Sequence, residues 1–178
     1  SVCAKVLHGL DEIFDAEKPD VILVQGDTTT AFAGAFAGFN RKIAVGHVEA
    51  GLRSGNLHSP FPEEANRRLV TQLATFHFAA TYNNCRVLKH EGIFGKQIFL
   101  TGNTVVDALH FVLNHSKPSE QIAQLLETTR DFKRILLTTH RRESFGDKMS
   151  SNLLQLKEFV SQQTDTCLIF PVHPNPNV

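Results

Sequence analysis

Ionisable side chains are concentrated in one segment, GHVEAGLRSGNLHSPFPEEANRR at residues 46–68, which follows an apolar run. The segment contains three glutamates, two histidines and three arginines. Carboxylates and imidazoles can take up and return protons, and guanidinium groups bind anions. The segment is therefore either a solvated surface or part of a catalytic site.

The strongest candidates stand at a predicted helix start. Pro62, Glu63 and Glu64 read as the first turn of a helix, with proline at the first helical position. Phe61 is a poor N-cap residue, and Pro60 stiffens the approach. A carboxylate at a helix N-terminus stays ionised readily, which suits a general base. An uncapped start between two prolines favours a ligand site.

A simpler interpretation of the same helix is surface ion pairing. Glu63 with Arg67, and Glu64 with Arg68, have i, i+4 spacing. Such pairs stabilise an exposed helix by roughly a few tenths of a kcal/mol each. The local sequence is compatible with both interpretations.

Further acidic residues follow two predicted strands. Asp27, in GDTTT, could cap the next helix, and the same helix start could present backbone amides to an anion. His47 and Glu49 form an H-x-E pattern, but the P-C-x-x-C partner of zinc deaminases is missing, so we predict no metal. Because alternate strand residues share a face, His47 and Glu49 could address one ligand, or they could be an exposed pair.

A second charged cluster, His140-Arg141-Arg142-Glu143, follows a later apolar run. Histidine and arginine side chains there could hold a diphosphate or another anion. The alternative is a solvated run of charges.

These residues must be positioned by apolar runs of strand length that alternate with segments of helical spacing. We expect the strands to be buried on both faces of a mainly parallel sheet, as in an α/β protein. Ligands bind at the carboxyl ends of such strands, where the candidate residues converge. Strands are predicted at 21–25, 43–49, 76–81, 97–102, 134–140 and 167–173, and helices at 4–20, 28–39, 62–75, 83–91, 104–114 and 147–162.

Composition narrows the function classes. The 178 residues are 42% hydrophobic, and 18 basic residues balance 18 acidic ones, so no bulk field attracts nucleic acid or a membrane surface. Three scattered cysteines argue against a disulfide framework and against structural zinc. The apolar runs are too short to span a membrane. Together these features favour a cytoplasmic protein. The phosphate-loop and G-x-G-x-x-G fingerprints are absent.

The chain is expected to contain parts of two domains. Gly102-Asn103 after a predicted strand would suit a hinge, so we place the domains at 1–102 and 103–178. The stretch 115–133 is polar and weakly periodic, and no element is assigned to it.

Six motifs, taken in order, resemble those of the non-hydrolysing UDP-N-acetylglucosamine 2-epimerases. They are GDTTT, GHVEAGLRSG, PEEANRR, TGNTVVDAL, HRRESFG and FPVHPNPNV, and the resemblance covers residues 17 to 178. It implies two Rossmann-like domains facing each other across a cleft, as in the glycosyltransferase B fold. It also implies a UDP-sugar substrate, no external cofactor and a homodimer.

By this resemblance, UDP leaves C1 of the sugar while a base removes the C2 proton, and readdition of UDP with reprotonation on the other face gives the epimer. Asp27, Glu49 and Glu63 are the implied acid/base residues. Arg67 would position substrate or the Glu63 carboxylate, and His140 would contact the diphosphate or assist catalysis. The other implied substrate contacts are Arg141, Arg142 and Glu143.

Two nucleotide-binding loops of the family have no counterpart in this sequence, namely an early glycine-arginine-proline-glutamate loop and a late serine-glycine-glycine loop. We therefore expect the central, incomplete portion of an epimerase, inactive or nearly so by itself. The alternatives are a non-catalytic or degenerate sugar-nucleotide-binding subunit and a related glycosyltransferase.

Overall fold

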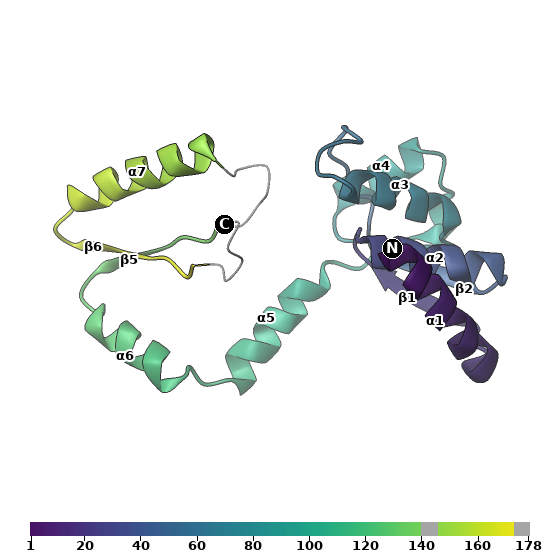
Figure 1. Ribbon diagram of the computed structural model, residues 1–178, viewed down its shortest axis with the longest axis horizontal. Coiled ribbons are helices and arrows are strands. Elements are labelled where there is room, and N and C mark those ends of the chain that lie inside the picture. Colours follow the sequence, from purple (N-terminus) through teal and green to yellow (C-terminus); the bar gives the residue numbers. More distant parts are fainter. Residues whose placement is uncertain (140–145, 173–178) are drawn as a thin grey trace. The chain divides into compact units, whose positions relative to one another are not determined.

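A computed structural model describes residues 1–139 and 146–172, except for the side chain of residue 148. The chain divides into two compact units, Ser1–Phe111 and Val112–Val178 (Figure 1). Within the described part of the chain, no helix is long and apolar enough to cross a membrane.

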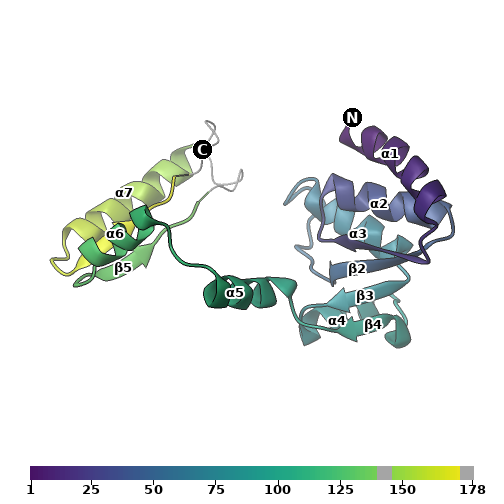
Figure 2. The same ribbon diagram turned by 90° about the horizontal axis from the view of Figure 1, so that it is seen from below.

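The first unit contains a parallel four-stranded sheet in the order β1-β2-β3-β4 (Figure 2). The strands are β1 (Val21–Gln25), β2 (Ala44–Ala50), β3 (Phe76–Ala79) and β4 (Ile98–Leu100). They are rich in β-branched and aromatic residues, which pack well on a pleated surface. The predicted parallel α/β architecture is confirmed.

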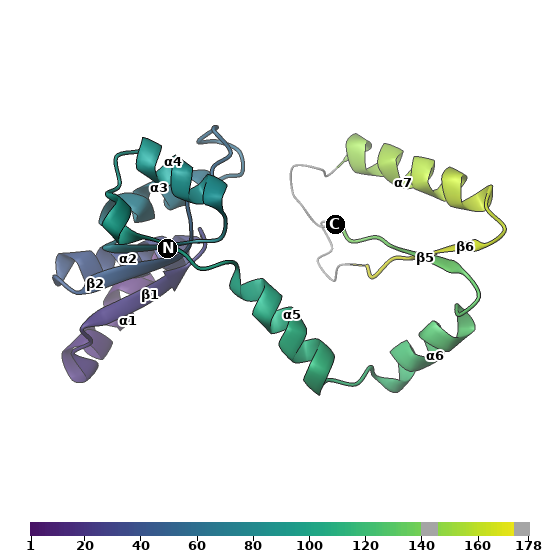
Figure 3. The same ribbon diagram turned by 180° about the vertical axis from the view of Figure 1, so that it is seen from behind.

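Helices join successive strands of this sheet: α2 (Thr29–Asn40), α3 (Glu63–Leu73), and α4 (Tyr82–His90), which is followed by the short 3-10 turn Gly95–Gln97. Because neighbouring parallel strands need right-handed crossovers, these helices cover one face of the sheet. The helix α1 (Val2–Glu17) packs on α2 (Figures 2 and 3). The main core cluster lies between α2, α3 and the strands, and consists of Val24, Ala31, Ala35, Val45, Val70 and Ala74.

Burial on both faces, which we predicted for every strand, is wrong for the sheet edges. In β1, Val24 is buried, whereas Leu23 is 66% exposed. Phe99 of β4, which pairs with Phe78, is 42% exposed. The reason is that, among the described elements, the crossover helices cover only the face toward which Val24 points.

The second unit begins within α5 (Thr104–His115) and continues with α6 (Glu120–Thr128), β5 (Lys133–Leu136), α7 (Asp147–Ser161) and β6 (Thr166–Ile169). Strands β5 and β6 pair in parallel. The helix α6 was not predicted, although Ile122, Leu125 and Leu126 have helical spacing within the polar stretch 115–133. It begins with an N-cap in which the Ser119 hydroxyl accepts a hydrogen bond from Ile122 N.

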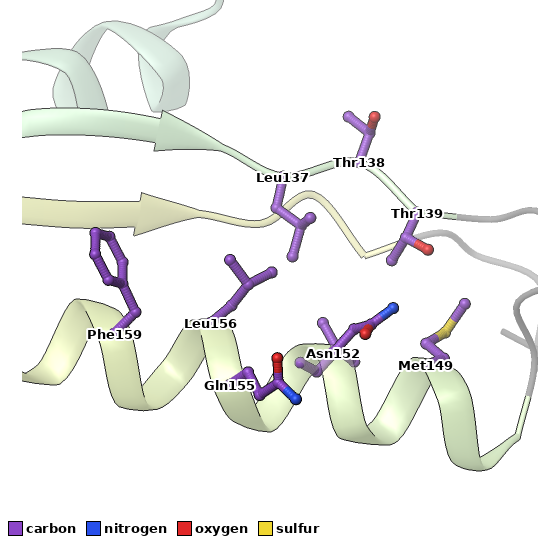
Figure 4. A pocket seen from close by; sticks show the side chains of 9 residues that line it. Leu137, Thr138, Thr139, Met149, Asn152, Gln155, Leu156 and Phe159 are labelled. Carbon is purple, nitrogen blue, oxygen red and sulfur yellow. The ribbon is translucent and has the colours of Figure 1, made fainter.

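A cavity of 560 Å³ lies between α7 and the residues that follow β5. Leu156 and Phe159 point from α7 toward the strands (Figure 4). Among the described residues that line it, none has an ionisable side chain. Its lining residues are Leu137, Thr138, Thr139, Met149, Asn152, Leu153, Gln155, Leu156 and Phe159.

Candidate functional site

The carboxyl ends of β1 and β2 bring three functional groups to one turn, at Gly26. The His47 Nε2 lies 2.9 Å from the Gly26 carbonyl oxygen, so the imidazole donates to this carbonyl. A Cβ atom at Gly26 would lie 3.4 Å from Glu49 Oε2, which places the Glu49 carboxylate beside the same turn. Asp27 follows Gly26 directly. His47 and Glu49 therefore both lie beside the turn at Gly26.

Glu49 has an unusual backbone conformation, with φ of 66°. The register between β2 and β3 shifts between Val48 and Ala50, so Glu49 lies in a bulge. A non-glycine residue in this left-handed region is strained, and such strain clusters at functional sites. The bulge re-aims the Glu49 side chain at the strand end.

Asp27 does not cap α2, so that prediction is wrong. The cap is Thr28, whose hydroxyl accepts from Ala31 N at 3.1 Å. The Asp27 carboxylate instead accepts from Arg67 Nε at 2.8 Å and Nη2 at 2.5 Å. The Asn66 amide also donates to the Asp27 carbonyl oxygen at 2.8 Å. These contacts dock the start of α3 on the turn between β1 and α2.

The predicted pairing along α3 is only partly correct. Glu64 pairs with Arg68, whose Nε lies 3.1 Å from Glu64 Oε1, but Glu64 is fully buried and the pair is not a surface one. Arg67 binds Asp27 and Glu64 rather than Glu63. Arg67 binds Asp27 because its guanidinium donates to that carboxylate through two nitrogens, whereas a helical i, i+4 pair is weak.

Burial raises the pKa of Glu64, but hydrogen bonds from Ser54 N–H, Arg68 and Arg67 together lower that pKa below its ordinary value. Glu64 is therefore an ionised, buried carboxylate whose charge is balanced by two guanidinium groups.

The surroundings of Glu63 differ from those of Glu64. It is the first residue of α3 and is half-buried, and Pro62 occupies the N-cap position without a side-chain cap. Within residues 1–139 and 146–172, no side chain pairs with its carboxylate. A carboxylate with no side-chain partner at an uncapped helix start is available to accept a proton.

The loop between β2 and α3 is held by Arg53, which sequence reasoning missed. Its guanidinium binds both oxygens of Glu91, at 2.8 and 2.6 Å, and donates to the Thr71 hydroxyl at 2.9 Å. On the other side of the loop, Asn84 donates to the Gly51 carbonyl oxygen at 3.1 Å. Glu91 is 38 residues from Arg53, so no local spacing reveals the pair.

Two histidines are buried side by side beneath this site. His47 and His77 are register partners on β2 and β3, and neither is exposed. Burial lowers the pKa of His47, and the hydrogen bond to the Gly26 carbonyl only partly offsets this. Burial and the neighbouring His47 lower the pKa of His77 to about 4. Both imidazoles are therefore neutral at pH 7.

The second predicted cluster, His140, Arg141, Arg142 and Glu143, lies outside the described residues. Within the part of the chain that the structure covers, no group of three or more His, Cys, Asp or Glu side chains is placed to hold a metal ion.

Fold and site define a Rossmann-like α/β protein with a cluster of carboxylates at the carboxyl ends of its strands. The family model "UDP-N-acetylglucosamine 2-epimerase" matches residues 1–178. This chain belongs to the UDP-N-acetylglucosamine 2-epimerase family.

Individual relatives agree with this family. The UDP-N-acetylglucosamine 2-epimerase of Yersinia pestis is 46% identical over 99% of this chain and 48% of its own length. The S. aureus MnaA–UDP co-structure is similar with a TM-score of 0.92 and 40% identity, over 98% of this chain and 47% of that one. The structure of the Neisseria meningitidis UDP-GlcNAc 2-epimerase bound to UDP-GlcNAc is similar with a TM-score of 0.90 and 40% identity, over 99% of this chain and 48% of that one. The chain spans about half the length of these relatives.

Proposed function

We propose that this chain carries the acid–base groups of a non-hydrolysing epimerase that converts UDP-N-acetylglucosamine to UDP-N-acetylmannosamine. The main support is the contact between Asp27 and Arg67. Glu63 precedes Arg67 by about one helical turn, so this contact docks the part of α3 that carries Glu63 on the turn that follows β1. Glu49 lies beside the same turn, at Gly26. We infer that these three carboxylates, which come from separate segments, face one place in the active protein.

Such a cluster suits the elimination that epimerisation needs. The C2 proton of the sugar is not acidified by a carbonyl group, so departure of UDP with the C1–O electron pair must lead. Carboxylates stabilise the positive charge that develops at C1. One carboxylate then takes the C2 proton, the C–H electrons form the C1=C2 bond of the glycal, and a second carboxylate returns a proton to the opposite face as UDP adds back.

The proposed roles follow from these surroundings. Asp27, Glu49 and Glu63 are the acid/base candidates, and Arg67 positions Asp27 and the substrate. We assign the diphosphate to His140 and to the basic residues that follow it. The whole activity is part of the proposal, because the chain spans about half the length of the relatives that it matches. A cytoplasmic homodimer stays a prediction, which gel filtration of an active protein would check.

Deuterium exchange tests the proposal. The assay uses a protein in which this chain replaces the matched region of the Yersinia pestis relative, and we call it the completed protein. With UDP-N-acetylglucosamine in deuterated water, it should place deuterium at C2 and form the epimer, as followed by NMR and mass spectrometry. Glu49→Gln and Glu63→Gln should each abolish most exchange.

The outcomes separate the alternatives. Undiminished exchange in both variants would contradict the acid/base roles assigned to Glu49 and Glu63. Sugar transfer without exchange would favour a glycosyltransferase, and binding without either reaction would favour a non-catalytic subunit.

A further inference from the structure

We propose that Glu64 is a positioning residue, which acts on Asp27 through the guanidinium of Arg67. This inference rests on the proposed function, but it concerns a residue that does not itself touch the substrate. Glu64 is fully buried. Its Oε2 accepts from Ser54 N at 2.9 Å and from Arg67 Nη1 at 3.2 Å, and its Oε1 accepts from Arg68 Nε at 3.1 Å.

These contacts exclude a proton-transfer role for Glu64. Both carboxylate oxygens are engaged by donors and hidden from solvent, so a substrate carbon cannot approach them. Glu63, the preceding residue, is half-buried, and its carboxylate has no side-chain partner among the described residues. Adjacent glutamates on one helix turn therefore have different surroundings, one suited to chemistry and the other to support.

Glu64 can influence Asp27 because the Arg67 guanidinium binds both carboxylates. Arg67 uses Nη1 for Glu64, while its Nε and Nη2 bind Asp27. Since the guanidinium is planar and rigid, fixing one nitrogen fixes the direction of the others. Glu64 thereby sets the orientation in which Arg67 holds Asp27 at the end of β1.

The competing explanation is that Glu64 only anchors the loop before α3, through Ser54 N–H. Glu64→Gln separates the two roles, because glutamine keeps the shape and an acceptor oxygen for Ser54 but loses the charge that holds Arg67. A merely structural residue would change the fraction of folded protein. A positioning residue changes kcat of the folded protein.

The test measures C2 exchange by the completed protein and its variants, with long incubations so that slow variants remain measurable. Glu64→Gln should lower kcat by about tenfold or more, since small misplacements near reacting groups have effects of this size. The KM for UDP-N-acetylglucosamine should change much less. Arg68→Gln is the matched control: it removes the other guanidinium from the same carboxylate, and kcat should stay close to that of the parent.

A double-mutant cycle decides whether the effect passes through Arg67. In an Arg67→Ala background, Glu64→Gln should cause no further loss of kcat. A parent-like kcat for Glu64→Gln, or a loss of equal size in the Arg67→Ala background, would overturn the inference.

Folding failure and failure of the proposed function have separate signatures. If Glu64→Gln does not fold, Glu64→Asp replaces it, because aspartate keeps the charge but shortens the side chain. Glu64→Asp should then lower kcat in the parent background and cause no further loss in the Arg67→Ala background. A parent protein without exchange overturns the proposed function itself. A parent with exchange that is insensitive to position 64 overturns only the role of Glu64.

Discussion

Arg67 and Asp27, 40 residues apart in the sequence, form a two-donor ion pair in which Nε and Nη2 lie 2.8 and 2.5 Å from one carboxylate oxygen. The two side chains are 16% and 24% exposed, so water screens the pair only partly. The contact joins the second turn of α3 to the turn that follows β1. It therefore serves both folding and the arrangement of the proposed site.

The first prediction concerns the stability of this contact. Arg67→Ala should lower the free energy of unfolding of the chain by about 2 kcal/mol, because Asp27 and Glu64 lose a partner while they stay shielded from water. Urea unfolding followed by circular dichroism measures this. The control is Arg41→Ala, which removes ion pairs to the exposed Asp11 and Asp15 and should cost much less. Equal losses in both variants would contradict the argument.

The second prediction concerns backbone strain at Glu49, whose φ is 66°. Glu49→Gly and Glu49→Ala both remove the carboxylate, but only glycine adopts this conformation freely. The glycine variant should therefore be more stable than the alanine variant by about 1 kcal/mol. Both should lack C2 exchange in the completed protein. If the alanine variant were as stable as the glycine variant, Glu49 would not be strained.

The third prediction concerns pH. The pKa of His77 is lowered from 6.5 to about 4, so between these values the unfolded chain binds a proton that the folded chain does not. Stability from the neutral His77 is thus fully present above pH 6.5 and is lost as pH falls toward 4. The loss is about 3 kcal/mol at most. His47, whose pKa is also lowered, acts in the same direction.

Unfolding free energies of the chain at several pH values between 4 and 7 check this. His77→Leu should make the dependence on pH shallower, because it removes one of the two buried imidazoles. A variant with an unchanged slope would show that His77 is accessible to protons in the folded state.

The fourth prediction concerns the contact between α2 and the sheet. A Cβ atom at Gly38 would lie 2.5 Å from Ile22 Cδ1 and 3.2 Å from Val45 Cγ2. Gly38→Ala should therefore lower the stability by about 1 to 3 kcal/mol through overpacking. Gly9→Ala on α1 is the matched control with the opposite sign, since nothing lies within 4 Å of its added Cβ and alanine favours the helix. A destabilising Gly9→Ala would contradict the argument.

Much of the fold could be predicted because hydrophobic periodicity is a local property. The run at 21–25 became β1, and the helix predicted at 28–39 is α2. The same reasoning missed α6, whose cap at Ser119 is a short local signal within a polar stretch. It also overestimated the burial of Leu23, since the number of helices covering a strand depends on neighbours that the strand itself does not specify.

The pairing of charges could not be predicted in the same way. Helical spacing suggested Glu63 with Arg67, but Arg67 turns to Asp27 across the fold. The spacing of Glu64 and Arg68 was informative, yet it did not reveal that the carboxylate is completely buried.

By itself, the sequence determined the parallel α/β class, the family and the short list of carboxylates at strand ends, because these depend on residue types and their order along the chain. Only the tertiary structure decided which carboxylates are neutralised and which stay available. Ion pairs depend on distance and on exclusion of water, and both arise only when segments far apart in the sequence pack together. Glu63 and Glu64, adjacent in the chain, differ for this reason.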